Sequence, residues 1–186
     1  MSSSWIPGWV AVAWVLAYAA IGLGHLIHVV AMSGGGRAWH AAHALMAAGM
    51  IDMFWPWGGM PFGAGSGEAA FALATAGYLV LTGVARRKAA RRFWLPTAAG
   101  LALMSYMFAL MSLRYLVVIT VLLAAWQLAE AMAWATGRRG LRGEGAAVRI
   151  SLALMSAGMA YMLLAMQFGM AAGGPAGPSM PGMPGM

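Results

Sequence analysis

The sequence predicts an all-α protein, a polytopic membrane bundle of six transmembrane helices. The chain has 186 residues, of which 62% are apolar and only 8% are charged. Its mean hydropathy of +0.77 is higher than a soluble domain of this length would have. Six apolar runs approach the roughly 20 residues that a helix needs to cross a hydrocarbon core about 30 Å thick. Basic residues concentrate between these runs, as they do in the loops of membrane proteins.

The six runs are separated by charged residues, glycine or proline. They extend over Pro7–Met32, Trp39–Trp57, Ala69–Ala85, Phe93–Ser112, Tyr115–Thr136 and Ala147–Met170. We expect the second helix to stop at Trp55-Pro56-Trp57, because proline ends a helix and tryptophan rings suit the headgroup level. No basic residue precedes the first run, so we expect that helix to be retained rather than cleaved as a signal peptide.

The basic residues predict the orientation. Eleven lysines and arginines face four acidic residues, and nine of the eleven lie between the third and fourth runs or around the start of the sixth: Arg86, Arg87, Lys88, Arg91, Arg92, Arg138, Arg139, Arg142 and Arg149. The positive-inside rule makes these loops and Arg37 cytoplasmic, with Arg114 as an exception. Both termini are then extracytoplasmic in the plasma membrane. Since topology accounts for the charge, the expected surroundings are lipid and no nucleic-acid partner is predicted.

The last 16 residues differ in composition from the rest. Residues 171–186 consist of glycine, proline, alanine, serine and methionine, which cannot form a packed core. We therefore expect a six-helix domain over residues 1–170 and a disordered external tail over 171–186. The tail still carries three possible sulfur ligands, Met180, Met183 and Met186.

One phrase recurs along the chain. Residues 43–53 read HALMAAGMIDM and residues 152–162 read LALMSAGMAYM, with seven of eleven positions identical, and residues 101–107 read LALMSYM. The second, fourth and sixth helices would run in the same direction, which suggests three repeated helix pairs. Alanine-rich membrane helices can also converge on such phrases through composition alone. We expect Gly49 and Gly158, which share one position of the phrase, to permit close helix approach.

All four histidines lie on the first two helices. His25 and His28 are three residues apart, as are His40 and His43, so each pair lies on one helix face. A short connection makes the two helices antiparallel neighbours, which places the four imidazoles at one depth near the cytoplasmic boundary. Four neutral imidazoles could then form one metal site. The alternatives are hydrogen-bonded contacts between helices and an interfacial pH sensor.

Methionine continues the pattern toward the other face. The chain has 18 methionines and no cysteine, which excludes disulfides and thiolate sites. Met46, Met50 and Met53 extend the histidine face of the second helix, and the sixth and fourth helices carry two further stripes: Met155, Met159, Met162, Met166 and Met170, and Met104, Met107 and Met111. Thioethers favour Cu(I), so these rows of methionines predict a path for copper that ends at the imidazoles. Packing alone is the competing interpretation.

Two acids interrupt the apolar runs, where a carboxylate is costly. Glu130 of the fifth helix lies about two turns from its cytoplasmic end, at the depth expected for the histidines. It could accept a hydrogen bond from a metal-bound imidazole and so orient it. Asp52 lies near the outer end of the second helix, where it could also extend toward the headgroups.

The phrase HALMAAGM, which contains His40, His43, Met46 and Met50, resembles a family of small actinobacterial membrane proteins. The family is classified as domain of unknown function 5134, and we expect the resemblance to extend from about Trp9 to Met170. It implies a membrane protein and adds no activity.

Three functions remain open. The first is copper handling, meaning binding, buffering or translocation of Cu(I) without catalytic turnover. The second is a b-type cytochrome or another haem-dependent redox protein, because histidines between helices are common axial ligands of haem b. The third is a structural or assembly subunit without a metal. With any of these functions, the protein could form a homo-oligomer or bind another membrane protein. No nucleophile, base and acid occur together, so hydrolysis is not expected.

Overall fold

The computed structural model describes residues 6–57, 59–84, 88–110, 116–138 and 145–172. Over these residues the chain is helical with no strand, and it forms six helices, as the sequence predicts. In chain order they are α1 (Gly8–Ala31), α2 (Gly34–Met53), α3 (Ala64–Val84), α4 (Lys88–Leu110), α5 (Val117–Ala135) and α6 (Ala146–Ala172).

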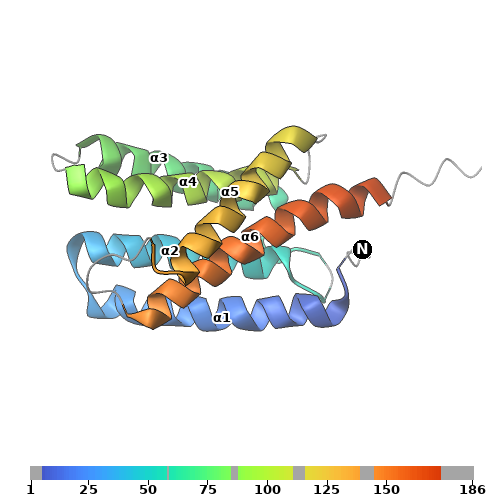
Figure 1. Ribbon diagram of the computed structural model, residues 1–186, viewed down its shortest axis with the longest axis horizontal. Coiled ribbons are helices and arrows are strands. Elements are labelled where there is room, and N and C mark those ends of the chain that lie inside the picture. Colours follow the sequence, from blue (N-terminus) through green and yellow to red (C-terminus); the bar gives the residue numbers. More distant parts are fainter. Residues whose placement is uncertain (1–5, 58, 85–87, 111–115, 139–144, 173–186) are drawn as a thin grey trace, which may run out of the picture.

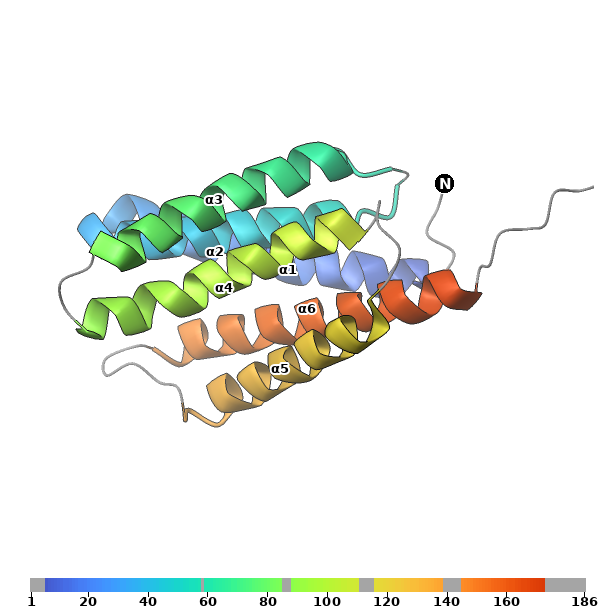
Figure 2. The same cartoon turned by 90° about the horizontal axis from the view of Figure 1, so that it is seen from above.

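The helices are arranged as three hairpins (Figures 1 and 2). Each of α1, α3 and α5 packs along the helix that follows it, α2 packs on α4, and α1 touches α6. The hydroxyl of Tyr78 on α3 donates a hydrogen bond to the backbone carbonyl of Ala38 on α2, which ties the second hairpin to the first. This arrangement matches the division into helix pairs that the repeated phrase suggests.

Three helices begin five residues earlier than their apolar runs. Helix α2 begins at Gly34 rather than Trp39, α3 at Ala64 rather than Ala69, and α4 at Lys88 rather than Phe93. Hydropathy detects only the part of a helix that suits hydrocarbon, whereas glycine-rich or charged turns at the ends can still be helical. The end of α2 agrees with the expectation, because the helix stops at Met53, before Pro56.

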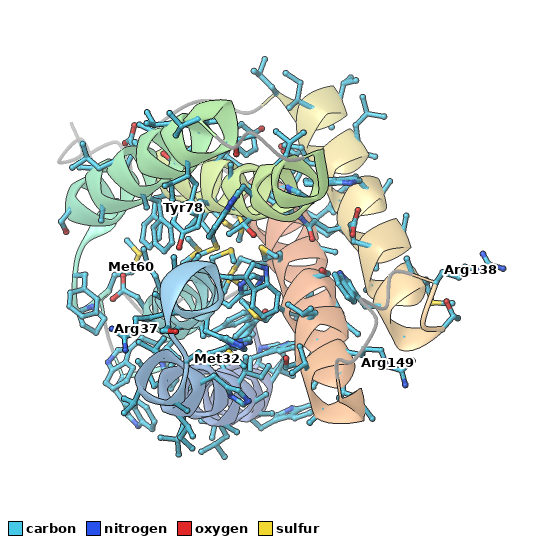
Figure 3. The ribbon with its side chains drawn as sticks, turned by 90° about the vertical axis from the view of Figure 1, so that its left-hand side faces the viewer. Met32, Arg37, Met60, Tyr78, Arg138 and Arg149 are labelled. Atoms are coloured by element: carbon cyan, nitrogen blue, oxygen red, sulfur yellow. The ribbon has the colours of Figure 1, made fainter. Side chains whose placement is uncertain are left out.

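Four of the described helices are long and apolar enough to cross a membrane, namely α1, α3, α5 and the part of α6 up to Phe168. Helix α4 contains a shorter apolar stretch over Trp94–Leu110. Helix α2 is 20 residues long, and its histidines, Arg37 and Asp52 make it more polar. In Figure 1, α1 begins and α6 ends at the same end of the bundle. Arg37, Arg138 and Arg149 lie at the opposite end, which faces the viewer in Figure 3.

The repeat glycines lie where helices approach closely. A methyl group at Gly49 would come within 2.7 Å of Phe71 on α3 and of Met104 on α4. A methyl group at Gly158 on α6 would overlap the hydroxyl of Tyr18 on α1. Both positions therefore require glycine for packing between hairpins, as expected from the sequence. Figure 3 shows that sulfur atoms gather in the middle of the bundle.

Candidate functional site

The four histidine rings of α1 and α2 form one stack in which the helices alternate. The ring centroids of His28 and His40 are 4.6 Å apart, those of His40 and His25 are 5.1 Å apart, and those of His25 and His43 are 5.2 Å apart. Trp39 lies against the stack, with its centroid 4.1 Å from that of His43. The spacing of three residues on each of two antiparallel helices produces this interleaved cluster.

Hydrogen bonds fix which ring nitrogens carry protons. Nδ1 of His28 donates to the carbonyl of Gly24 (2.7 Å), and Nδ1 of His43 donates to the carbonyl of Trp39 (2.8 Å). A carbonyl can only accept, so in the neutral rings Nε2 keeps the lone pair that a metal would use. The Nδ1 atoms of His25 and His40 are 2.8 Å apart, so one of these rings donates to the other.

One polar atom of the cluster is buried without a partner. His25 is only 3% exposed, and its Nε2 makes no hydrogen bond. A buried polar atom without a hydrogen-bond partner lowers the stability of the fold unless water, an ion or a ligand binds to it. Among the described residues, no group of three or more histidine, aspartate or glutamate side chains has the geometry to hold a metal ion. The stack therefore brings the four predicted residues together as hydrogen-bonded rings, and any metal ligand set would include other donors.

Those other donors line a cavity of about 170 Å³ beside the stack. His43 and Met46 of α2 face it from one side, and Met155 and Met159 of α6 face it from another. Met46 and Met155 occupy the same position of the repeated phrase, as do Met50 and Met159. The sulfur of Met46 also lies close to Gly100 of α4, where a methyl group would stand 3.1 Å from it. The cavity thus joins one imidazole to three thioethers.

Helix α5 adds oxygen atoms to this cavity. Glu130 is 8% exposed and lines the cavity together with His43, and its Oε1 accepts a hydrogen bond from Nε1 of Trp126 (3.2 Å). Gln127 lies one turn earlier, is 2% exposed, and has a side-chain oxygen without a hydrogen-bond partner. The carboxylate of α5 is therefore inside the bundle and on the histidine side of it.

The remaining predicted methionines are in the core. Met50, Met53 and Met162 are buried in the main apolar cluster and do not line the cavity. The stripe of α4 and the outer part of the α6 stripe are buried in the same cluster through Met104, Met107 and Met166. Met111, the side chain of Met170 and the tail methionines lie outside the part of the chain that the structure describes.

Asp52 does not extend toward headgroups. Its side chain is 1% exposed, and its Oδ1 accepts a hydrogen bond from the backbone N–H of Phe62 (2.9 Å). The carboxylate therefore fastens the connection between α2 and α3 to the end of α2. Its Oδ2 has no hydrogen-bond partner, and Asp52 is not among the residues that line the cavity.

Several cavity residues were not foreseen from the sequence, above all Gln127 of α5 and Ser156 of α6. Gln127 precedes Glu130 by three residues, so the two share one helix face, and that spacing could have indicated a polar wall. Ser156 is a small polar residue of a kind common in membrane helices, and only the packing of α5 and α6 against α2 and α4 reveals its position.

The described residues form an all-helical bundle with helices of membrane-spanning character. It holds a histidine cluster beside a cavity lined by His43 and three methionines. The family model described as "Domain of unknown function (DUF5134)" matches residues 35–117, which confirms the resemblance for that region. The match includes His40, His43 and Met46, and it is shorter than the span from Trp9 to Met170 expected from the sequence. Searches of curated proteins and of solved structures find no match.

Proposed function

We propose that this protein binds Cu(I) in the membrane and holds or passes it through a site made of thioethers and imidazole. The observation that carries the proposal is the shared cavity of Met46, Met155, Met159 and His43. Thioether sulfur is soft and uncharged, so it prefers Cu(I) to Zn²⁺, Mg²⁺ or Ca²⁺. His43 presents a neutral Nε2 because its Nδ1 donates to Trp39.

The rest of the histidine stack supports His43. His25 stacks on His43, and His40 in turn exchanges a hydrogen bond with His25. This packing fixes the ring orientation, as outer partners of metal-bound histidines do. Glu130 lines the same cavity, and its Oε1 accepts a hydrogen bond from Nε1 of Trp126. The buried methionines beyond the cavity continue the sulfur path toward the end of the bundle where α6 ends.

Haem b binding is the alternative, and the packing of the histidines favours copper. A bis-histidine haem needs two rings separated by the macrocycle. The four rings here lie against one another, and the centroids of neighbouring rings are 4.6 to 5.2 Å apart. This spacing leaves no room for a macrocycle between them. The cavity beside them presents sulfur, which suits a single soft ion.

The test is a competition titration of the full-length protein in mild detergent with a chromogenic Cu(I) chelator, without oxygen. We expect one tight site in the parent. Met155→Leu with Met159→Leu should weaken it by at least about tenfold, since even outer partners of a metal ion contribute that much. Met166→Leu is the matched control, because Met166 is fully buried on the same helix and does not line the cavity.

A second pair of changes tests the imidazoles. His40→Ala combined with His43→Ala should abolish tight binding. Equal Cu(I) affinity in the double leucine variant and the control would mean that the thioethers serve only for packing. Purification with a Soret absorption band and no copper would overturn the proposal in favour of haem.

A further inference from the structure

A second cavity, of about 410 Å³, lies between α1 and the first part of α6. It shares no described lining residue with the cavity of the proposed copper site. Its volume is within the range of roughly 300–1,000 Å³ that is usual for small-molecule sites. Ala20, Ile150 and Leu154 line it and are exposed, so it opens on the outer surface of the bundle, which faces lipid in a membrane protein. A hydrophobic ligand could therefore enter it from the bilayer.

Small residues of α1 leave this space unfilled. Ala20 and Gly24 line the cavity and are four residues apart, so they lie on one face of α1. A methyl group added at Gly24 would meet no atom within 4 Å. Apolar side chains of both helices, among them Ile21, Ile150 and Leu154, complete the walls. The cavity thus has the space and the lining for an apolar body.

Its polar lining consists mainly of imidazoles. Among the described residues that line it, none is lysine, arginine, aspartate or glutamate, and the polar side chains are His25, His28, His40 and Ser151. A phosphate head group would find no cation there, whereas a neutral head group with hydrogen-bonding atoms suits imidazole. His25 is only 3% exposed, and its Nε2 has no hydrogen-bond partner. In native structures such an atom is usually completed by water or a ligand.

The hydrogen bond between His25 and His40 determines what these two rings offer to a ligand. Their Nδ1 atoms are 2.8 Å apart, so one neutral ring donates its Nδ1–H and the other accepts it. The donating ring then has a lone pair at Nε2, and the accepting ring carries its proton at Nε2. Whichever ring donates, the pair provides one N–H donor and one acceptor at its two Nε2 atoms. A ligand that alternates between a carbonyl and a hydroxyl group can therefore be bound in both forms.

We propose that this cavity binds the head group of a membrane quinone, with the ring between α1 and α6 and its oxygen atoms hydrogen-bonded to the imidazoles of His25 and His40. The oxidised quinone has carbonyl acceptors for the N–H, and the reduced quinol has hydroxyl donors for the lone pair. Both forms are neutral, as a cavity without charged side chains requires, and their apolar tail can remain in the lipid through the opening at Ile150 and Leu154. The site needs no copper and is independent of the proposed function.

The test is equilibrium binding of radiolabelled decylubiquinone to the full-length, copper-free protein in mild detergent. We expect saturable binding, with competition by the reduced quinol but not by decylbenzene, which has the ring and the tail without the oxygen atoms. Equal competition by decylbenzene or by phosphatidylglycerol would show that the cavity holds only a hydrocarbon chain, and would overturn the proposal. Absence of saturable binding would overturn it as well.

Two variants test the placement of the ring. Ala20→Phe should abolish saturable binding, because the phenyl group occupies the space that the quinone ring needs. His25→Leu should weaken binding by roughly three- to tenfold, as loss of one neutral hydrogen bond does. Ala19→Phe is the matched control, because Ala19 is the exposed neighbour of Ala20 and does not line the cavity. Equal quinone affinity in the Ala20 and Ala19 variants would overturn the proposal.

The same variants keep this site apart from the copper site. Ala20→Phe should retain Cu(I) affinity, because Ala20 does not line the copper cavity. Met155→Leu with Met159→Leu should lose Cu(I) affinity and bind the quinone as the parent does. Failure of either proposal is therefore seen without the other.

Discussion

At the scale of residues, Tyr18 and Gly158 position the part of α6 that carries the cavity methionines. The hydroxyl of Tyr18, fully buried on α1, donates a hydrogen bond to the backbone carbonyl of Met155 (3.1 Å). Gly158 leaves the space that the hydroxyl occupies. This contact joins the first hairpin to the third directly beside the cavity, so it positions a proposed ligand without touching the metal.

Substitution of this glycine tests the contact. Gly158→Ala places a methyl group against Tyr18, and overpacking of this kind costs about 1–3 kcal/mol. We expect a lower unfolding temperature and weaker Cu(I) binding. Gly77→Ala on α3 is the control, because a methyl group there meets no atom within 4 Å. Similar behaviour of the two variants would show that Tyr18 and Gly158 do not set the position of α6.

At the scale of elements, α2 packs on an apolar core but makes polar contacts near each of its two ends. Toward the arginine-bearing end, its histidines stack with those of α1. At its other end, Asp52 accepts the hydrogen bond from Phe62 and so closes the connection to α3. The helix is thus held at both ends, while Met46 and Met50 pack in between.

Two substitutions of Asp52 separate hydrogen bonding from charge. Asp52→Asn keeps an oxygen for the Phe62 N–H, so its effect on thermal unfolding should be small. Asp52→Ala leaves that N–H unpaired and should destabilise the protein by about 1–3 kcal/mol. If both variants lose the same stability, the negative charge of Asp52 matters and the hydrogen bond does not.

The elements also show what the sequence could and could not predict. Apolar runs identified all six helices, because the length of a membrane-spanning helix is set by the thickness of the hydrocarbon core. The histidine cluster followed from spacing within one hairpin. The cavity did not, since Gln127, Ser156 and Met155 meet Met46 only through packing between hairpins, which no local pattern encodes. For the same reason, Met50 appeared equivalent to Met46 in sequence but lies in the core away from the cavity.

At the scale of the whole molecule, Arg37, Arg138 and Arg149 lie at one end of the bundle, and the start of α1 and the end of α6 lie at the other. The positive-inside rule would set the arginine end, with the nearby histidine stack, in the cytoplasm. Copper entering from outside would then meet sulfur first and imidazole last.

The absence of cysteine makes this orientation easy to test. Trp57 comes shortly after the end of α2, and Arg138 shortly after the end of α5, and these two helix ends lie at opposite ends of the bundle. Both side chains are exposed, so Trp57→Cys and Arg138→Cys each introduce an accessible thiol. We expect a membrane-impermeant maleimide to label the Trp57 variant in intact cells, and to label the Arg138 variant only after permeabilisation. The reverse result would invert the orientation and the direction of the sulfur path.

The most direct test of the copper site is X-ray absorption at the copper K edge of the Cu(I)-loaded protein. The account predicts a first shell that contains sulfur together with imidazole nitrogen, and a marked loss of the sulfur contribution when Met155 and Met159 are both changed to leucine. A shell of nitrogen and oxygen alone in the parent protein, or a spectrum unchanged by the two substitutions, would contradict it.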